Sequence, residues 1–451
     1  MAVTGLPDDF VWGVSTSAYQ IEGATLAGGR GESIWDRFTA VDGRVSDGSD
    51  GSITTDHYHR WEEDLELLTA LGVGAYRFSL AWPRLQPGGR GGLAPAGVDF
   101  YDRLLDGLLA RGIDPWVCLY HWDLPQALQD KGGWPLRDCA YYFADYAERV
   151  AALVAGRSKH LFLLNEPNVH AVMGHLLGLH APGTSDIGDF FAALHHQNLA
   201  SGMGVERLRE AAPGAALGTI LNLQPVLAGA RGEEHEAAAG LVDAVYNRGV
   251  LDPLLLGSYP ATIEGFLEPY LKDGDLAQAS RPIDLLGVNH YTRLYVLADP
   301  DGPAGLALGA PPAGSEVTDM GWEVAPDALF AQLLELKNDY GNPAVVITEN
   351  GAAYSDRQEP AGGIEDQGRT AYLASYIGAA ARALGAGCDV RGYFAWTLVD
   401  NFEWSFGFDK RFGLVHLDRR TLARTPKRSF AAFRQIVAAN GVPDEFADSD
   451  L

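Results

Sequence analysis

The sequence predicts an α/β protein with a single (β/α)₈ barrel, and three observations support this fold class. Eight short apolar runs favour β structure, and they begin near residues 10, 75, 114, 160, 217, 283, 344 and 390. The intervals between them, roughly 40–65 residues, leave room for a helix after each strand. Several runs are apolar throughout and become polar only where they end, as expected for strands of a buried parallel sheet. Eight alternating strands and helices are expected to close into a barrel whose long βα loops form the active site.

The segments between these runs account for the rest of the chain. The first run extends from Phe10 to Glu22 and is followed by a Gly/Asp/Ser-rich loop at residues 42–56. The Gly/Pro/Ala-rich stretch 299–315 is predicted to be a long mobile loop. Helical periodicity predicts helices over residues 61–71, 98–110, 139–155 and 190–208.

The chain is predicted to be one domain. We find no internal repeat and no linker that separates two compositionally distinct halves. Barrels with long loops can exceed 400 residues, so the length does not require a second domain. We therefore expect residues 1–451 to form a single domain, with the barrel at about 10–437 and a polar tail at 443–451.

Composition and charge restrict the partners and the compartment. No apolar run approaches the roughly 18 residues that span a bilayer, and the N-terminus shows no signal-peptide pattern. The three cysteines, Cys118, Cys139 and Cys388, have no CxxC spacing, which argues against disulfides or zinc and favours the cytoplasm. The net charge of −25 disfavours nucleic acid and anionic membranes as partners. A small-molecule substrate is expected instead, and a homo-oligomer remains compatible with the sequence.

Two glutamates stand at the ends of predicted strands. Glu166 follows the apolar run 161–164 and Asn165, and Glu349 follows the run 345–348 and precedes an Asn-Gly turn. Further polar and aromatic residues stand at the other strand ends: Gln20, Arg77, His121, Trp122, Asn165, Asn289, Tyr291, Trp396 and Glu403. Paired carboxylates with amide donors and aromatic platforms suit cleavage of a glycosidic bond. One carboxyl group protonates the leaving oxygen, and the other attacks or stabilises the anomeric centre.

Four motifs make a family resemblance specific. Leu164–Pro167, Ile347–Gly351, Tyr19–Gly23 and Asp400–Trp404 resemble signatures of glycoside hydrolase family 1, the β-glucosidase family, and the similarity extends from about Phe10 to Val437. The resemblance implies retaining hydrolysis of β-glycosides without a cofactor or a metal. It also implies that Glu349 is the nucleophile and Glu166 the acid/base. In that scheme Arg77 and Tyr291 hold Glu349 ionised, and its charge keeps Glu166 protonated until the glycosyl-enzyme forms.

The resemblance also implies the residues that bind the sugar. Asn165 resembles the donor to the sugar 2-hydroxyl, Trp396 the stacking platform, and Trp322 is a candidate wall of the aglycone site. The other expected contacts are Gln20, His121, Trp122, Tyr291, Glu403 and Trp404, with Arg77 and Asn289 in support. A carboxylate at Glu403 would repel phosphate, so an unphosphorylated sugar is expected.

Some residues depart from the family pattern or allow a different interpretation. Asn168 and His290 stand where many members carry Trp and Tyr, and both are expected to affect aglycone preference. His57 and His59 resemble an HxH metal pair, but they precede a helix instead of closing an apolar strand. We therefore expect no metal site there.

A retaining β-glucosidase acting on cello-oligosaccharides or aryl β-glucosides, and hence a part in cellulose degradation, is the leading hypothesis. A 6-phospho-β-glycosidase, a broad β-galactosidase or β-fucosidase, and a transglycosylase are alternative enzymes. A catalytically inactive sugar-binding barrel is the alternative from another class, although such proteins typically lose one carboxylate and this chain keeps both Glu166 and Glu349.

Overall fold

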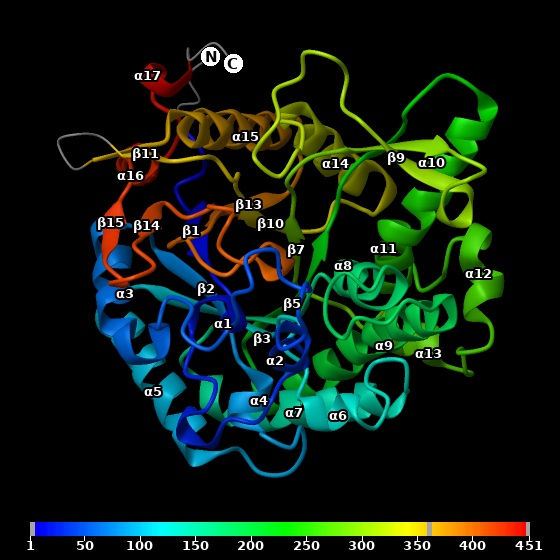
Figure 1. The fold of residues 1–451 in the computed structure, drawn as a ribbon, viewed down its shortest axis with the longest axis horizontal. Helices are drawn as coiled ribbons and strands as arrows, with labels where there is room; N and C mark the ends of the chain where they lie inside the picture. The colour runs from blue at the N-terminus through cyan, green and yellow to red at the C-terminus, as the bar shows by residue number, and fades with distance from the viewer. Residues whose placement is uncertain (1–4, 359–362, 448–451) are drawn as a thin grey trace.

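A computed structural model describes residues 5–358 and 363–447, and its centre is a closed barrel of eight parallel strands (Figure 1). Each strand pairs with the next barrel strand along the chain, and the last pairs with the first. The barrel strands are β1 (Val11–Ser15), β2 (Ala75–Ser79), β3 (Asp114–Tyr120), β4 (His160–Asn165), β5 (Ala216–Asn222), β7 (Leu285–Asn289), β10 (Val345–Asn350) and β13 (Val390–Trp396). The predicted fold class is confirmed, and every strand begins within two residues of its predicted start.

Apolar side chains fill the interior of the barrel. Trp116 and Cys118 of β3, Phe162 of β4 and Phe394 of β13 belong to one buried cluster with residues from three further strands. The Trp116 and Phe394 ring centroids are 4.9 Å apart. Because bulky side chains occupy this space, the barrel is a packed core and only its end is available for a site. Cys118 is buried, as are the other two cysteines, and all three are free thiols.

Helices surround the barrel, as Figure 1 shows. The longer ones are α3 (His57–Leu71), α5 (Pro95–Ala110), α7 (Asp138–Val154), α9 (Ile187–Ala211), α10 (Glu233–Tyr246), α11 (Arg248–Leu255), α14 (Pro326–Asp339), α15 (Gln367–Gly385) and α16 (Arg428–Ala439). Short helices in the loops are α1 (Ala18–Ile21), α2 (Ile34–Thr39), α4 (Trp82–Leu85), α6 (Gln126–Gln129), α8 (Pro167–Ala171), α12 (Ala261–Leu267) and α13 (Asp275–Ala279). Single helical turns are η1 (Ala27–Gly29), η2 (Val172–Leu176), η3 (Pro303–Gly305) and η4 (Trp404–Phe406).

Helix starts explain most differences from the predicted boundaries. Helix α5 begins at Pro95, whose fixed φ suits the first helical turn, three residues before the predicted start. Helix α9 begins at Ile187, because the side chain of Asp186 accepts a hydrogen bond from the Asp189 backbone N–H. Periodicity alone does not detect such first-turn residues, since they carry no apolar side chain facing the core.

The stretch 299–315 is more ordered than predicted. Strand β9 (Leu306–Gly309) pairs antiparallel with β8 (Leu294–Ala298), which pairs parallel with β6 (Val226–Ala228). This small sheet lies beside α10, outside the barrel (Figure 1). The prediction of an unstructured loop was therefore wrong for this part, because alternating apolar residues of β8 and β9 pack against the helix.

The described part of the predicted polar tail contains one further element. A short helix, α17 (Asp444–Ala447), occupies the first part of that segment, and residues 448–451 lie outside the described residues. Two small hairpins complete the fold: β11 (Arg357–Gln358) with β12 (Ile364–Glu365), and β14 (Val415–Leu417) with β15 (Arg424–Pro426). Within the described ranges, none of the helices has the length and apolar character needed to cross a membrane.

Candidate active site

Four successive barrel strands end in asparagine. Asn165 closes β4, Asn222 closes β5, Asn289 closes β7 and Asn350 closes β10. Parallel strands bring their C-terminal ends to the same rim of a barrel, so these amides gather at one end of the molecule. The side chains of Asn165, Asn222 and Asn289 belong to the network of the two glutamates described next, whereas that of Asn350 contacts the surrounding core. The sequence predicted only two of the four, Asn165 and Asn289, as site residues.

Glu349 lies one residue before the end of β10 and is almost completely buried, with an exposed fraction of 3%. One of its carboxylate oxygens pairs with Nη1 of Arg77, and the other accepts a hydrogen bond of 2.6 Å from the Tyr291 hydroxyl. Arg77 itself is fully buried. Burial, followed by the nearby charge of Glu349, holds the pKa of Tyr291 well above its usual value, so this hydroxyl remains a donor. Both contacts stabilise an ionised Glu349.

Glu166 directly follows β4 and has an exposed fraction of 4%. Its Oε1 atom accepts hydrogen bonds from Nδ2 of Asn289 at 2.7 Å and Nδ2 of Asn222 at 2.9 Å. Burial raises the pKa of Glu166 to about 8, and the negative charge of Glu349 acts in the same direction. The amide donors oppose this shift without cancelling it. Glu166 is therefore protonated at neutral pH.

A continuous hydrogen-bond network joins the two glutamates. Arg77, which pairs with Glu349, also donates from Nη2 to Oδ1 of Asn165 at 2.6 Å. The same Oδ1 accepts a bond of 3.1 Å from Asn289, which contacts Glu166. A carboxylate paired with a guanidinium and a carboxyl group with a raised pKa thus share one set of buried polar contacts. Such a pair can supply both an acid and a nucleophile.

His121 lies beside this network, immediately after β3. Because Asn165 Oδ1 accepts from Arg77 and Asn289, its Nδ2 is the group that faces Nε2 of His121, at 3.1 Å. Nε2 must then accept, which leaves the proton on Nδ1. Burial, reinforced by the charge of Arg77, lowers the pKa of His121 far below its usual value, so the ring is neutral. The Nδ1 atom is buried and has no hydrogen-bond partner among the described residues.

Gln20 and Glu403 occupy the opposite side of the site. Gln20, in α1, donates from Nε2 to the carbonyl oxygen of Phe402 at 2.9 Å and lies 3.4 Å from Oε2 of Glu403. Burial raises the pKa of Glu403 to about 8, and the charges of Glu349 and Glu166 add to this effect. The carboxyl groups of Glu166, Glu349 and Glu403 therefore lie close enough for their charges to act on one another.

Aromatic rings form the remaining wall. Trp396 is the last residue of β13, and its ring stacks on that of His121 with the centroids 6.2 Å apart. The ring of Trp404 also stacks on His121, with the centroids 5.9 Å apart. Trp122 contacts Trp404 at 4.7 Å, and its indole N–H donates to the carbonyl oxygen of Asn165 at 2.9 Å. The indole N–H of Trp122 is thus already paired with the protein, and only its ring is available for a ligand.

Trp322 packs against Tyr291, whose hydroxyl binds Glu349. Its ring centroid is 5.4 Å from that of Tyr291 and 6.2 Å from that of Phe412. Trp396 and Met320 belong to the same cluster. Twelve of the thirteen residues predicted from the sequence lie at the C-terminal end of the barrel or in the loops beside it. Arg77, expected at a strand end, lies in the middle of β2, and its long side chain reaches Glu349.

The backbone at the site adopts unusual conformations. Glu166, Trp122 and Trp404 have positive φ angles of 48°, 74° and 50°. Such left-handed conformations are disfavoured for residues with a side chain and are concentrated at functional sites. Gly351 has a different constraint, because a Cβ at this position would overlap the carbonyl oxygen of Trp396. The Asn-Gly sequence after Glu349 thus allows β10 and β13 to approach closely.

Asn168 and His290 are buried and do not line the site directly. Asn168 donates from Nδ2 to the carbonyl oxygens of Asn222 at 2.7 Å and Tyr246 at 2.9 Å. His290 contacts the carbonyl oxygen of Leu223 at 2.8 Å through Nδ1. Both side chains therefore act on the packing around β5 and β7. Any effect of Asn168 or His290 on aglycone preference would therefore act through this packing and not through direct contact.

Asn222 and Thr348 are site residues that the sequence analysis missed. Asn222 bonds to Glu166, and Thr348 donates to Oδ1 of Asn289 at 2.7 Å. Asn222 was within reach of the rule that polar residues near strand ends form the site, because it lies two residues before the end of the predicted strand 217–224. Thr348 could not be recognised by this rule, because it lies inside its strand, between the apolar residues and Glu349.

The profile of glycosyl hydrolase family 1 matches residues 3–442 of the chain. The chain belongs to this family. Beta-glucosidase A of Acetivibrio thermocellus is 42% identical over 454 residues, which cover 98% of this chain and all of the relative. A bifunctional beta-D-glucosidase/beta-D-fucosidase of Bifidobacterium breve is 42% identical, covering 96% and 98% of the two chains. The solved structure of the Thermotoga maritima beta-glucosidase in complex with glucoimidazole superimposes with a TM-score of 0.93 at 41% identity, covering 98% and 100%.

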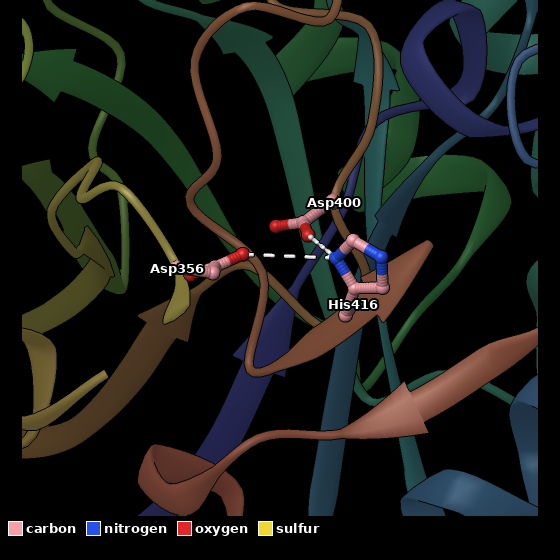
Figure 2. Close-up of side chains that lie close together, drawn as sticks. All are labelled: Asp356, Asp400 and His416. Carbon is pink, nitrogen blue, oxygen red and sulfur yellow. Dashed lines mark ion pairs between the residues drawn. The ribbon is translucent and has the colours of Figure 1, made fainter. Parts of the chain in front are cut away.

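This family 1 barrel contains a second cluster of ionisable groups, shown in Figure 2. Nδ1 of His416, in β14, lies 3.7 Å from Asp356 and 3.5 Å from Asp400. The two carboxylates raise the pKa of His416 to about 9. Their arrangement resembles a metal-binding triad. However, the ammonium of Lys427 already contacts Asp356 at 2.9 Å and Asp400 at 2.7 Å, so a cation of the protein itself neutralises them.

The cluster connects three loops around the site. Asp356 follows β10, and Asp400 precedes Glu403 by three residues. Lys427, just before α16, has a side chain with an exposed fraction of 0%. Burial and the neighbouring Arg369 lower the pKa of Lys427, against the attraction of the two aspartates. The network therefore ties the Glu403 loop to the C-terminal part of the chain.

Replacement of Lys427 by methionine is expected to destabilise the fold by about 3–5 kcal/mol, because it removes the buried ammonium that pairs with both Asp356 and Asp400. In thermal unfolding the midpoint should fall by about 3–5 °C, because the entropy of unfolding of a 451-residue chain is large. The matched control is Lys272→Met, which removes an exposed lysine and should leave the midpoint nearly unchanged. Equal midpoints for the two variants would contradict a stabilising role of Lys427.

Proposed function

We propose that the protein is a retaining β-glucosidase that releases terminal β-D-glucosyl residues by double displacement. One observation carries this proposal. Glu349 is paired with a buried arginine and a tyrosine hydroxyl, whereas Glu166, in the same network, has a pKa raised to about 8. An ionised carboxylate beside a protonated carboxyl group is the combination that retaining hydrolysis requires. Membership of glycosyl hydrolase family 1 supports the same reaction.

In the first step Glu349 attacks the anomeric carbon, and the C1–O bond breaks while Glu166 transfers its proton to the leaving oxygen. The negative charge of Glu349 disappears in the covalent intermediate. Because that charge contributes to the raised pKa of Glu166, the pKa falls and Glu166 becomes a base. It then accepts a proton from the water that attacks C1. The bond between Glu349 and the sugar breaks, and the original protonation states return.

The sugar contacts follow from the groups that remain available around the glutamates. We assign the 2-hydroxyl to Asn165 and one face of the ring to Trp396. His121 offers its Nδ1 proton to a further hydroxyl, since that atom has no partner among the described residues. The remaining contacts are assigned to Gln20, Glu403, Trp404, Trp122 and Tyr291, with Trp322 facing the aglycone.

Short cello-oligosaccharides and aryl β-glucosides are the substrates that we propose. A second activity, hydrolysis of β-fucosides, is favoured by the similarity to the bifunctional relative from Bifidobacterium breve. A fucoside lacks the 6-hydroxyl, and because burial raises the pKa of Glu403, this loss need not leave a bare buried charge at that residue. We also propose that the protein works in the cytoplasm, because its three cysteines are free and buried.

The proposal is tested with nitrophenyl β-glycosides and NMR. We expect the β-anomer of glucose as the first product. Hydrolysis of the glucoside should be at least about 100-fold faster than that of its 6-phosphate, since the phosphate would be repelled by the charge of Glu349 and by the ionised fraction of Glu403. The β-fucoside serves as the comparison for the second activity. Release of α-glucose as the first product would overturn the retaining mechanism, and a preference for the 6-phosphate would overturn the substrate assignment.

A further inference from the structure

The acid/base candidate Glu166 has two unequal carboxyl oxygens. Oε1 accepts two hydrogen bonds, from Nδ2 of Asn289 at 2.7 Å and Nδ2 of Asn222 at 2.9 Å. In the described part of the chain, no side chain or backbone group donates to Oε2. The difference matters because a protonated carboxyl group carries its proton on one oxygen only, and the other oxygen remains an acceptor.

The orientation of both amides is fixed by other contacts. Oδ1 of Asn222 accepts from Nε2 of Gln224 at 2.8 Å and from the Tyr246 hydroxyl at 2.9 Å. Oδ1 of Asn289 accepts from the Thr348 hydroxyl at 2.7 Å. Each amide must therefore present its NH₂ group to Glu166. Two N–H donors occupy the acceptor directions of Oε1, which leaves no direction for a proton on that atom.

We propose that Asn222 is a positioning residue that, together with Asn289, fixes the acidic proton of Glu166 on Oε2. This inference rests on the proposed function, since it assigns the atom from which the leaving group is protonated. In the first step the proton moves from Oε2 to the glycosidic oxygen as the C1–O bond breaks. In the second step Oε2 accepts the proton of the attacking water as the bond between Glu349 and C1 breaks.

Asn222 also favours the charged form of Glu166. A hydrogen bond to a carboxylate stabilises it, so the two amides counteract the burial that raises the pKa of Glu166. Without them the group would remain protonated at a higher pH and would be a poorer partner for water in the second step. The other ionisable groups that act on Glu166 from the surrounding elements are Glu349, Arg77, Glu403, Tyr246 and Tyr291.

The test is the pH dependence of kcat/KM for an aryl β-glucoside in the wild type and in Asn222→Ala. Loss of one charge-assisted donor is expected to move the alkaline limb upward by about one pH unit. In Tyr246→Phe, where Asn222 keeps its amide but loses one contact that orients it, the limb should move in the same direction by less. A mutation that only loosened the structure would lower the rate without moving the limb.

An alkaline limb that stays in place in both variants, in an otherwise active protein, would overturn the role of Asn222. If Asn222→Ala does not fold, Tyr246→Phe decides alone, and an unmoved limb in that variant has the same meaning. Failure of the proposed function gives a different result, because the wild type itself would then not hydrolyse β-glucosides. Glu166→Gln shows whether the alkaline limb belongs to Glu166. This variant is assayed with a dinitrophenyl glucoside, whose leaving group needs no proton, and the limb should then be absent from its pH profile.

Discussion

Glu349→Ala is expected to lose nearly all turnover of aryl β-glucosides, with kcat lower by about 10⁵–10⁶-fold. The substitution removes the only group that we propose to attack the anomeric carbon. It also leaves the buried guanidinium of Arg77 without its carboxylate partner. Circular dichroism and the unfolding midpoint would show that the variant is folded. A variant that still turns over at the normal rate would exclude Glu349 as the nucleophile.

Small anions provide the sharper measurement for this variant. Formate or azide can occupy the space of the missing carboxylate beside Arg77 and Tyr291 and attack the sugar directly. With azide and a dinitrophenyl β-glucoside, a single displacement should yield the α-glucosyl azide, identified by NMR. The matched control is Glu349→Gln, in which the amide fills the space and should prevent rescue. Rescue of both variants to the same extent would argue against a vacant nucleophile site.

Glu166→Ala has an expected effect that depends on the leaving group. For substrates that need protonation, kcat/KM should fall by about 10²–10⁴-fold, whereas for a dinitrophenyl glucoside it should change by less than about 10-fold. The kcat for the dinitrophenyl substrate should still decrease, because the second step lacks its base. Azide should restore it and yield the β-glucosyl azide, the opposite anomer from the Glu349→Ala product. An equal loss for all leaving groups would contradict the acid role.

The barrel was predictable because its signal is repeated eight times. Each strand is a short apolar run that turns polar where it ends, and this pattern depends only on local burial. The same rule placed Glu166 and Glu349 at one rim, and the structure shows that Arg77, Asn165 and Asn289 connect them. The family profile confirms the resemblance that the four motifs indicated.

Other features depend on contacts between distant segments, and the sequence did not predict them. The orientation of the Asn222 amide is one of them, because it is set by Gln224 and Tyr246. The cluster of Asp356, Asp400 and Lys427 joins residues that are up to 71 positions apart, and no local pattern marks it. The hairpin of β8 and β9 was missed because its many glycines, prolines and alanines also suit an irregular loop.

The pairing of β1 with β13 has a consequence for how the protein is made. Val11 lies opposite Gly392, so the first barrel strand is completed by one that is almost 400 residues later in the chain. A nascent polypeptide leaving the ribosome must therefore keep an open sheet edge until nearly all of it has been synthesised. During that interval the exposed edge is open to pairing with other chains. Chaperone binding to incomplete chains would cover this edge until the last strand arrives.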